Sequence, residues 1–518
     1  MYKKMAALGL ALCSLLSVAV ADVAAGSRWD TRQLIIRLQD DGLRRIQALQ
    51  PRQPLPDLRL PDGRPLTLLR RFDGNGVVVR LPESVSLEEA QRLADQLVAD
   101  PVVAAAQPDK RLYPALIPSD PRFLPDPSDP VFPLGQWNLF EDTAGIRVTS
   151  AWDRTTGSAA TVIAVLDTGI VDHIDLDSTR VLAGYDFISD SWTANDGDGR
   201  DPDPTDPGDG TADGDCGAGI PGEADSWHGL AVTGVAVAQS DNGIGIAGID
   251  FRARLLPVRV LGRCGGDVSD VVAAIRWAAG LPVAGAPSNP TPADVINLSL
   301  SGTGSCSAEE QAAIDDAYNA GALVVVAAGN EGVDVTNISP ANCDHVVAVG
   351  AIARDGSRAP YSNVGAAVDL SAPGGDGSNS DAGGVLTLWK QGTVTPATSY
   401  ASIAGTSFAA AQVSAAAALM RAVDPSLPPA TLAELLRRTA RSFPDASCTT
   451  SSCGAGVLDV DYALAGAADP TAILGSRVNS GGGCTLGAAG GRFDPLWLLF
   501  ALALVGYRAR KRRHSSPC

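Results

Sequence analysis

The sequence predicts an α/β fold, in which a parallel sheet has helices on both faces, preceded by a small α+β domain. Two observations support the larger domain. Continuous apolar runs recur from about residue 134 to 467, and segments with helical spacing separate them. Apolar strands that alternate with helices are typical of parallel sheets buried on both faces. Functional side chains in such sheets collect at the carboxyl ends of the strands.

The small domain is expected over residues 22–115. Strand-like runs stand at 33–38, 77–81 and 102–106. Ser86 and Glu89 form a capping box, and apolar residues at helical spacing follow them. A linker rich in Pro and Asp follows this domain over residues 116–134.

The larger domain is expected over residues 135–467. Its strands are predicted at 161–166, 255–261, 295–300, 322–328, 346–352 and 368–370, and its helices at 231–238, 271–279 and 307–320. The segment 195–215 is different, because it repeats Asp-Pro and has no apolar pattern. Its carboxylates suit calcium, but the complete EF-hand pattern is missing, so we expect a solvated acidic loop.

Both ends of the chain carry export signals. Lys3 and Lys4, an apolar stretch over residues 5–20 and a small-residue cleavage site predict a signal peptide over residues 1–21. A Gly/Ser-rich linker over 468–483 leads to residues 484–518, where a short apolar helix is followed by an Arg-rich end. That order predicts a membrane helix with its positive end inside the cell.

The charge and the cysteines narrow the function further. The formal net charge of -18 argues against binding to nucleic acid or to anionic membrane surfaces. Six cysteines lie between the signal peptide and the C-terminal segment, and an even set in an exported chain predicts three disulfides. Six cysteines allow many pairings; we favour neighbours in chain order, namely Cys216–Cys264, Cys306–Cys343 and Cys448–Cys453.

The stretch from 403 to 412 reads as a loop that turns directly into an Ala-rich helix. We expect Gly405 to permit the tight turn, and Ser407 to lie in the first turn of the helix. Backbone N–H groups are free there, and the helix dipole favours negative charge. A simpler interpretation is that Thr406 and Ser407 only cap the helix.

Two further residues decide between these interpretations. Asp167 ends the first apolar strand of the larger domain, and His228 opens a helix of small residues. Nucleophilic acyl transfer needs a hydroxyl, a base that activates it and an acid group that orients the base. Asp167, His228 and Ser407 supply these groups in the chain order Asp, His, Ser, which is the order of subtilisin-type enzymes.

The segments at 166–169, 228–229 and 405–407 resemble the three signature segments of the subtilase family. A fourth segment, at 327–331, resembles the oxyanion segment of that family. The resemblance covers roughly residues 135–467 and implies a subtilisin-like serine endopeptidase. It implies a catalytic triad of Asp167, His228 and Ser407, with the oxyanion held by the Asn330 amide and the Ser407 N–H. The acidic loop and the Cys264-Gly265-Gly266 segment resemble the secreted, disulfide-bonded branch from Gram-negative bacteria.

The same resemblance extends to substrate binding. Residues expected to bind substrate are Ser299, Leu300, Ser301, Gly302, Ala328 and Gly329. Ser301 stands where the family usually has Gly, which favours small or medium apolar side chains in the pocket. Leu230, Ala231 and Phe408 also depart from the family pattern, so the sequence does not decide how the side chains beside His228 and Ser407 pack.

The regions outside the larger domain fit this family. Residues 22–115 resemble a propeptide that acts as chaperone and inhibitor, and residues 484–518 resemble a sorting signal cut by a membrane protease. We expect protein or peptide substrates, a monomer, no cofactor for the chemistry, and structural calcium as an option. The chain is expected to be secreted or at the cell surface, with transient anchoring in the inner membrane. Two alternatives are a catalytically impaired subtilase-fold binding protein and an acidic calcium-binding surface protein.

Overall fold

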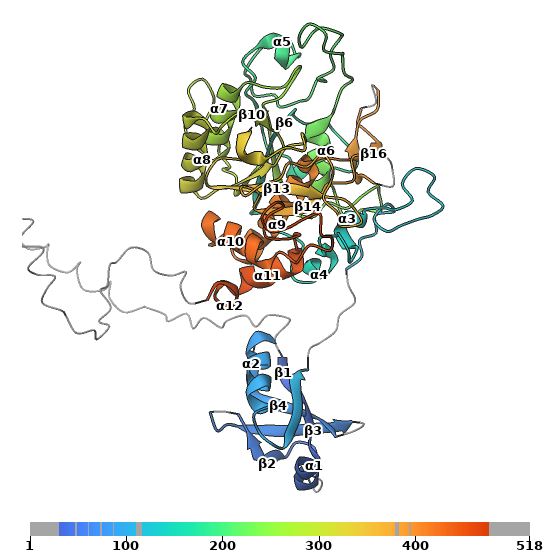
Figure 1. Cartoon of the computed structure of the whole chain (residues 1–518), viewed down its shortest axis with the longest axis vertical. Coiled ribbons are helices and arrows are strands. Elements are labelled where there is room, and N and C mark those ends of the chain that lie inside the picture. The colour runs from blue at the N-terminus through green and yellow to red at the C-terminus, as the bar shows by residue number, and fades with distance from the viewer. Residues whose placement is uncertain are drawn as a thin grey trace, which may run out of the picture. The chain divides into compact units, whose positions relative to one another are not determined.

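The computed structural model describes residues 31–475, apart from 47–48, 61, 73–74, 86, 110–115, 379–382 and 393–394. The chain forms two compact units, Met1–Pro114 and Ala115–Cys518 (Figure 1). The expected signal peptide at 1–21 and the expected membrane helix in 484–518 lie outside the described residues. Among the helices within that described part, we find none that combines the length and the apolar character needed to cross a membrane.

The first unit is an antiparallel sheet with the strand order β2-β3-β4-β1-β5. Its elements are β1 (Thr31–Leu38), α1 (Asp40–Ile46), β2 (Pro54–Arg59), β3 (Pro65–Phe72), β4 (Gly76–Val85), α2 (Leu87–Leu97) and β5 (Val103–Pro108). Leu34 and Ile36 of β1 pack with Val77 and Val79 of β4 in a core that also takes apolar residues of α2. The sequence pattern missed β2 and β3, whose residues alternate less clearly.

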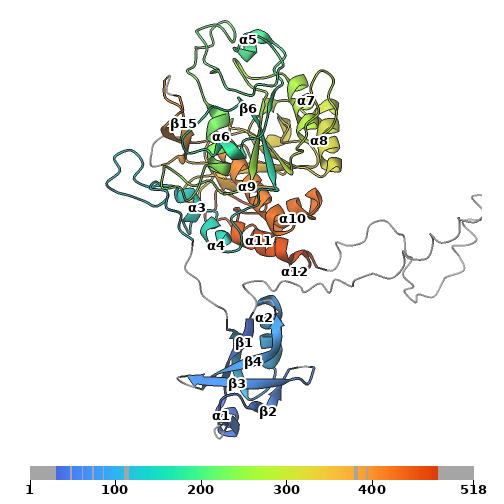
Figure 2. The same cartoon turned by 180° about the vertical axis from the view of Figure 1, so that it is seen from behind.

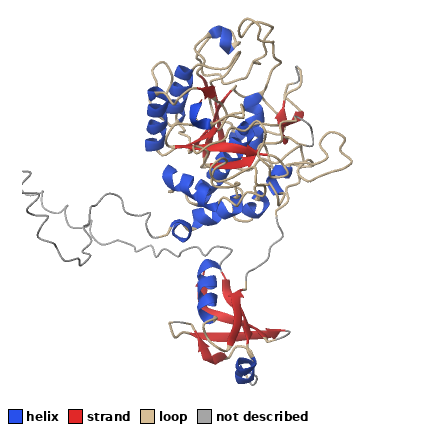
Figure 3. Cartoon of the chain, in the orientation of Figure 1, coloured by secondary structure: helices blue, strands red, loops and turns tan. Residues whose placement is uncertain are grey.

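The second unit is built on a parallel sheet of seven strands in the order β14-β13-β11-β9-β6-β8-β7 (Figure 3). The strands are β6 (Val162–Asp167), β7 (Tyr185–Asp186), β8 (Arg254–Arg259), β9 (Val295–Leu298), β11 (Leu323–Ala327), β13 (Val346–Ile352) and β14 (Leu370–Pro373). Successive side chains of a strand point to opposite faces, so fully apolar strands must be covered twice.

Two hydrophobic cores cover the sheet, one on each face. Along β6, Ile163 and Val165 enter one core, while Val162, Ala164 and Leu166 enter the other. The first core takes α6 (His228–Val237), α9 (Thr406–Val423), α10 (Pro429–Thr439) and α11 (Val460–Ala468); the second takes α7 (Val268–Ala278) and α8 (Ala308–Ala320). Figures 1 and 2 show α7 and α8 together on one side of the sheet. The predicted α/β class, with helices on both faces, is confirmed.

Shorter elements complete the second unit. They are α3 (Trp137–Phe140), α4 (Val148–Trp152), α5 (Ser191–Ala194), β10 (Gly302–Thr303), β12 (Ile338–Ser339), β15 (Val385–Trp389), β16 (Ser399–Ile403) and α12 (Pro470–Leu474), with two short 3-10 helices at Ser178–Arg180 and Val335–Asn337. Three disulfides join Cys216 to Cys264, Cys306 to Cys343 and Cys448 to Cys453. These are the pairs expected from chain order.

Candidate active site

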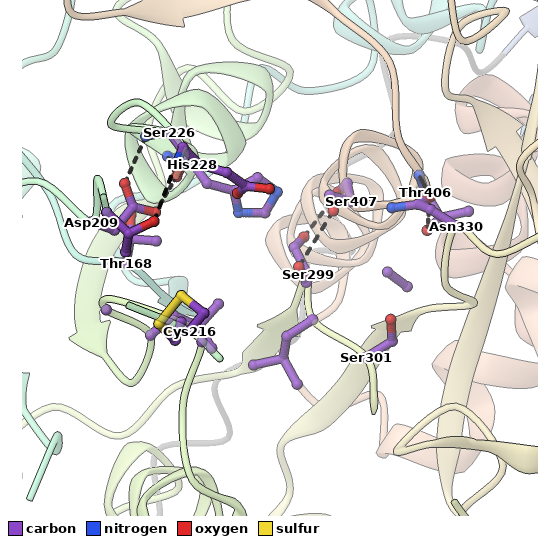
Figure 4. A pocket seen from close by; sticks show the side chains of 18 residues that line it. Thr168, Asp209, Cys216, Ser226, His228, Ser299, Ser301, Asn330, Thr406 and Ser407 are labelled. Atoms are coloured by element: carbon purple, nitrogen blue, oxygen red, sulfur yellow. Dashed lines mark hydrogen bonds between the residues drawn. A yellow bond between two sulfur atoms is a disulfide. The ribbon is translucent and has the colours of Figure 1, made fainter. Parts of the chain in front are cut away.

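Three separate elements bring the predicted triad to one cleft. Asp167 is the last residue of β6, His228 is the first of α6, and Ser407 is the second of α9. His228, Ser407 and Asn330 line a cavity of about 340 Å³, and Asp167 is fully buried behind His228. Figure 4 shows His228 on one wall of this cleft, with Ser407 and Asn330 facing it. The sheet therefore assembles residues that are far apart in sequence.

The His228 ring is oriented by the Asp167 carboxylate. His228 Nδ1 lies 2.7 Å from Asp167 Oδ1, and the backbone N–H of Thr168 donates to the same oxygen at 2.8 Å. The Asp167 side chain is 1% exposed, whereas that of His228 is 26% exposed. A carboxylate only accepts, so Nδ1 carries the proton and Nε2 is left as the basic nitrogen. This is the tautomer that a general base needs.

The pKa of His228 reflects opposing effects. Burial lowers it, but the charge of Asp167, the hydrogen bond that His228 donates to Asp167, and the charges of Asp209 and Asp206 raise it, and the net direction is upward. The negative groups around the ring favour the imidazolium, which is the form that His228 takes after it accepts a proton.

Ser407 lies at the amino end of α9 and is almost fully buried. Its hydroxyl donates to the Ser299 carbonyl at 3.3 Å, a long hydrogen bond. The simple capping interpretation is wrong, because the N-cap residue is Gly405, which makes no side-chain cap, and the Thr406 hydroxyl instead contacts Asn330 and Gly329. The expectation for Gly405 is also wrong: its φ of 167° is extended backbone, which needs no glycine.

Asn330 has a fixed amide orientation. Its Oδ1 accepts from the Thr406 backbone N–H at 2.9 Å and from the Thr406 hydroxyl at 2.8 Å. Because both donors hold the oxygen, the Nδ2 amide group is the end left for the cleft. The side chain and the amino end of α9 thus present donors to the same space, as Figure 4 shows for Asn330 and Ser407.

The cleft wall contains part of the predicted substrate-binding set. Ser299, Leu300 and Ser301 line the cavity. Gly302, Ala328 and Gly329 are not among the residues that line it: Gly302 pairs with Ser339 between β10 and β12, and the Gly329 N–H donates to Thr406.

The sequence reasoning missed the opposite wall. It comes from the acidic segment and from the chain that follows β8, and the lining residues there are Asp209, Thr211, Cys216, Glu223, Ser226, Leu261, Gly262, Cys264 and Gly265. The Cys216–Cys264 disulfide joins these two stretches at the cleft (Figure 4). Cys216, which directly follows the segment 195–215, was the feature of the sequence that could have predicted this wall, because a disulfide must hold the segment against the rest of the domain.

The expected solvated loop at 195–215 is a wrong prediction for Asp206, which is buried, whereas Asp196 is exposed and Asp209 is half-buried. Asp206 is 2% exposed, and Asp196 pairs with the buried Arg259, which also pairs with Asp186. Both carboxylate oxygens of Asp209 accept from Ser226, at 2.6 Å each. Buried charges need such partners, and here the partners are distant in sequence.

Comparisons with known proteins agree with this geometry. The model of the subtilase family matches residues 158–459. The chain belongs to the subtilase family. It is 44% identical over 404 residues to an extracellular protease of Xanthomonas campestris pv. campestris, and 38% identical over 410 residues to an extracellular basic protease of Dichelobacter nodosus. These alignments cover 78% and 77% of this chain, but only 66% and 63% of those relatives.

A solved structure is also similar. It is described as proteases from Pseudoalteromonas arctica, with 46% sequence identity and a TM-score of 0.63. The match covers 68% of this chain and 99% of that one. The subtilisin-like arrangement of the second unit is therefore shared with an experimentally determined relative.

Of the departures from the usual subtilase pattern, Ser301 lines the cleft, whereas the other three are buried. Leu230 and Ala231 are fully buried and pack in hydrophobic cores, and Phe408 is 2% exposed in the core beneath α9. The Phe408 ring lies 6.0 Å from the His228 ring, measured between centroids. These three side chains fill the interior and leave the cleft open.

Metal ligation was an open option for this subtilase. Within the described ranges, His, Cys, Asp and Glu side chains form no group of three or more that could hold a metal ion.

Gly229 is required by a close approach of two backbones. A Cβ at this position would lie 2.2 Å from the carbonyl oxygen of Gly169, which stands two residues after Asp167. Real Cβ atoms do not approach backbone so closely, so Gly229→Ala must push the first turn of α6 away from the Asp167 segment. We expect kcat to fall about tenfold or more, because the His228–Asp167 geometry is displaced. Steady-state kinetics on a peptide substrate measures this.

Gly466→Ala is the matched control for Gly229→Ala. Gly466 lies in α11, and its added methyl would meet flexible side chains of Leu435 and Ile473. It should lower the melting temperature without changing kcat of the folded protein. An unchanged kcat in Gly229→Ala would show that the glycine contact does not set the geometry of the site.

Proposed function

We propose that this subtilase is a secreted serine endopeptidase with a triad of Asp167, His228 and Ser407. The observation that carries the proposal is the 2.7 Å contact between His228 Nδ1 and the buried Asp167 carboxylate, in the cleft that also contains Ser407. The names of the relatives, extracellular protease and extracellular basic protease, support hydrolysis of peptide bonds outside the cell.

The proposed reaction begins with proton transfer. The Ser407 hydroxyl turns from the Ser299 carbonyl toward His228 Nε2, gives up its proton and attacks the scissile carbonyl carbon. His228 then carries the proton as an imidazolium and returns it to the leaving amine. Asp167 keeps Nδ1 protonated and stabilises the positive charge. Water repeats the sequence on the acyl-enzyme and frees Ser407.

The oxyanion is stabilised by two donors. The Asn330 Nδ2 amide is held toward the cleft by the hydrogen bonds of its Oδ1, and the Ser407 N–H lies in the first turn of α9. Donors that are already fixed stabilise the developing charge without reorganisation. Side chains and backbone carry every step, so the chemistry uses no cofactor.

The proposal includes the precursor. Residues 22–115 would act as a propeptide that is removed by the enzyme itself, and a membrane sorting protease would cut the C-terminal segment 484–518. The separate compact unit formed by the first residues supports the first part. Substrates are proteins or peptides, with small or medium apolar side chains favoured beside Ser301, and the mature enzyme is a monomer.

Labelling with a fluorophosphonate tests the proposal directly. An adduct on Ser407 of the processed protein, lost when the protein is unfolded before labelling, is the expected result. No adduct in processed, folded protein would favour the impaired, binding-only subtilase. A protein that is stabilised by calcium but hydrolyses no peptide would favour the acidic calcium-binding alternative.

The pH dependence provides an independent measurement. His228 must be neutral to accept the Ser407 proton, and its pKa is raised above the ordinary value of 6.5. Activity should therefore fall as the pH decreases, with the midpoint of kcat/KM above 6.5. Asp209→Asn removes a nearby negative charge and should move the midpoint to lower pH by roughly half a unit. A midpoint that does not move would remove Asp209 from the electrostatics of the base.

A further inference from the structure

Asp206 is a buried carboxylate that the proposed mechanism does not use. It lies in the acidic segment between β7 and α6 and is 2% exposed. Backbone hydrogen bonds tie this part of the segment to Ile170: the Asp206 N–H donates to the Ile170 carbonyl at 2.9 Å, and the Ile170 N–H donates to the Pro204 carbonyl at 3.0 Å. Ile170 is three residues beyond Asp167, so Asp206 is fixed beside the chain that carries the catalytic acid.

The Asp206 carboxylate contacts one hydroxyl, that of Thr168. Thr168 Oγ1 donates to Asp206 Oδ2 at 2.7 Å, and the other oxygen, Oδ1, accepts from the Gly208 N–H at 2.8 Å. The same Thr168 Oγ1 accepts from the Gly229 N–H at 3.0 Å. A hydroxyl has one proton, so giving it to Asp206 directs a lone pair toward Gly229.

Thr168 also contacts the catalytic acid through its backbone. Its N–H donates to Asp167 Oδ1, the oxygen that accepts from His228 Nδ1. The Arg259 Nε donates to the Thr168 carbonyl at 3.2 Å, which holds the residue from the other side. Thr168 thus joins three parts: the Asp167 carboxylate, the first turn of α6 and the acidic segment. Figure 4 shows Thr168 on the same wall of the cleft as His228.

We propose that Asp206 is a positioning residue, which acts through the Thr168 hydroxyl to hold the first turn of α6, and with it His228, at hydrogen-bonding distance from Asp167. The proposal rests on the assigned Asp167–His228 pair. Its physical basis is the cost of an unpaired buried hydroxyl: without the carboxylate, the Thr168 O–H has no fixed acceptor and can turn its proton toward the Gly229 N–H. The acidic segment therefore helps to hold His228, the proposed general base, in place.

The negative charge of Asp206 has a second consequence. Burial raises the pKa of Asp206 to about 6, while its hydrogen bonds to Thr168 and Gly208 lower it. Asp209 and Arg259 are the charged groups beside it. Asp206 is one of three carboxylates, with Asp167 and Asp209, whose charge raises the pKa of His228. Replacing it should therefore change the titration of His228 as well as its position.

Asp206→Ala tests the positioning role. We expect kcat to fall about 10- to 100-fold with KM nearly unchanged, since the base is displaced while the substrate-binding wall at Ser299, Leu300 and Ser301 is intact. Asp203→Ala is the matched control: Asp203 is an exposed acid of the same segment, and its carboxylate accepts from the Thr205 N–H and hydroxyl. It should leave both constants unchanged. A rise in KM at constant kcat would overturn the proposal, because Asp206 would then only shape the cleft.

A double-mutant cycle identifies the route of the effect. Thr168→Val removes the hydroxyl and keeps the shape of the side chain, and Thr168→Ser restores the hydroxyl. We expect Thr168→Val to resemble Asp206→Ala, Thr168→Ser to approach wild-type kcat, and Asp206→Ala to cost little more in the Thr168→Val background. Additive effects would contradict action through Thr168. If Asp206→Ala does not fold, Thr168→Val and Thr168→Ser carry the test: equal kcat in these two variants would contradict action through the Thr168 hydroxyl.

A measurement that needs no activity separates this proposal from the proposed function. Nitrogen NMR of the His228 ring, in full-length Ser407→Ala protein, reports the Nδ1 proton and the pKa. Asp206→Ala should weaken the Nδ1–H signal and lower the pKa, whereas Asp206→Asn should lower the pKa and keep the signal. If both variants leave the Nδ1–H signal and the pKa of His228 unchanged, the proposed role of Asp206 is overturned. An inactive wild-type enzyme with the expected ring signals would refute only the peptidase assignment.

Discussion

Ser407→Ala is expected to reduce kcat by about 10⁶-fold, the loss known for the nucleophile of a related triad. The hydroxyl oxygen of Ser407 forms the covalent bond to the acyl group, and no other hydroxyl acts as a nucleophile in the proposed mechanism. The precursor should also stay uncleaved near residue 115, because the same nucleophile is proposed to remove the propeptide. Kinetics on a peptide substrate and the mass of the purified chain measure the two effects.

Ser414→Ala provides the matched control for Ser407→Ala. Ser414 is a buried serine of the same helix, and its hydroxyl donates to Asn297 Oδ1 at 2.8 Å. Its loss should lower stability by about 1 kcal/mol and leave kcat of the folded enzyme unchanged. A purified Ser407→Ala precursor that still processes itself, with no other protease present, would contradict the triad.

Asn330→Ala is expected to lower kcat about 10²- to 10³-fold with a small change in KM. The amide meets the oxyanion in the transition state and has no equivalent role toward the ground-state carbonyl, so the loss should appear in kcat. Asn330→Asp should be at least as damaging, because a carboxylate cannot donate and repels the oxyanion. Separate values of kcat and KM on one substrate measure this.

The control for Asn330 is Asn337→Ala, an exposed asparagine at the end of a short 3-10 helix. Its substitution should leave kcat unchanged. A large rise in KM in Asn330→Ala, with kcat preserved, would place Asn330 in substrate binding and leave the oxyanion to other donors.

The positions of the residues of the proposed triad could be predicted because local sequence decides them. Asp167 follows a run of apolar residues that must be a buried strand, and His228 and Ser407 open helices of small residues. In a parallel sheet the carboxyl ends of strands share one edge, so the fold class placed these groups near one another. The Asn330 segment follows β11 for the same reason.

The burial of Asp206 in the acidic segment could not be predicted, because it depends on partners distant in sequence. Asp206 reads as a solvated carboxylate until Thr168 is placed beside it. The prediction that Gly405 permits a tight turn was wrong for a local reason, because its backbone is extended. Gly229, for which no separate prediction was made, is the glycine that lies against another backbone. Pair contacts between segments, rather than propensities, set these positions.

The Cys216–Cys264 bond fastens the acidic segment to the chain after β8 at the cleft itself. Thiols are kept reduced in a cytoplasm and oxidise in secretory compartments. On the proposal that this chain is secreted, a newly made chain would lack this bond before export and acquire it afterwards, so this wall of the cleft would be completed only outside the cytoplasm.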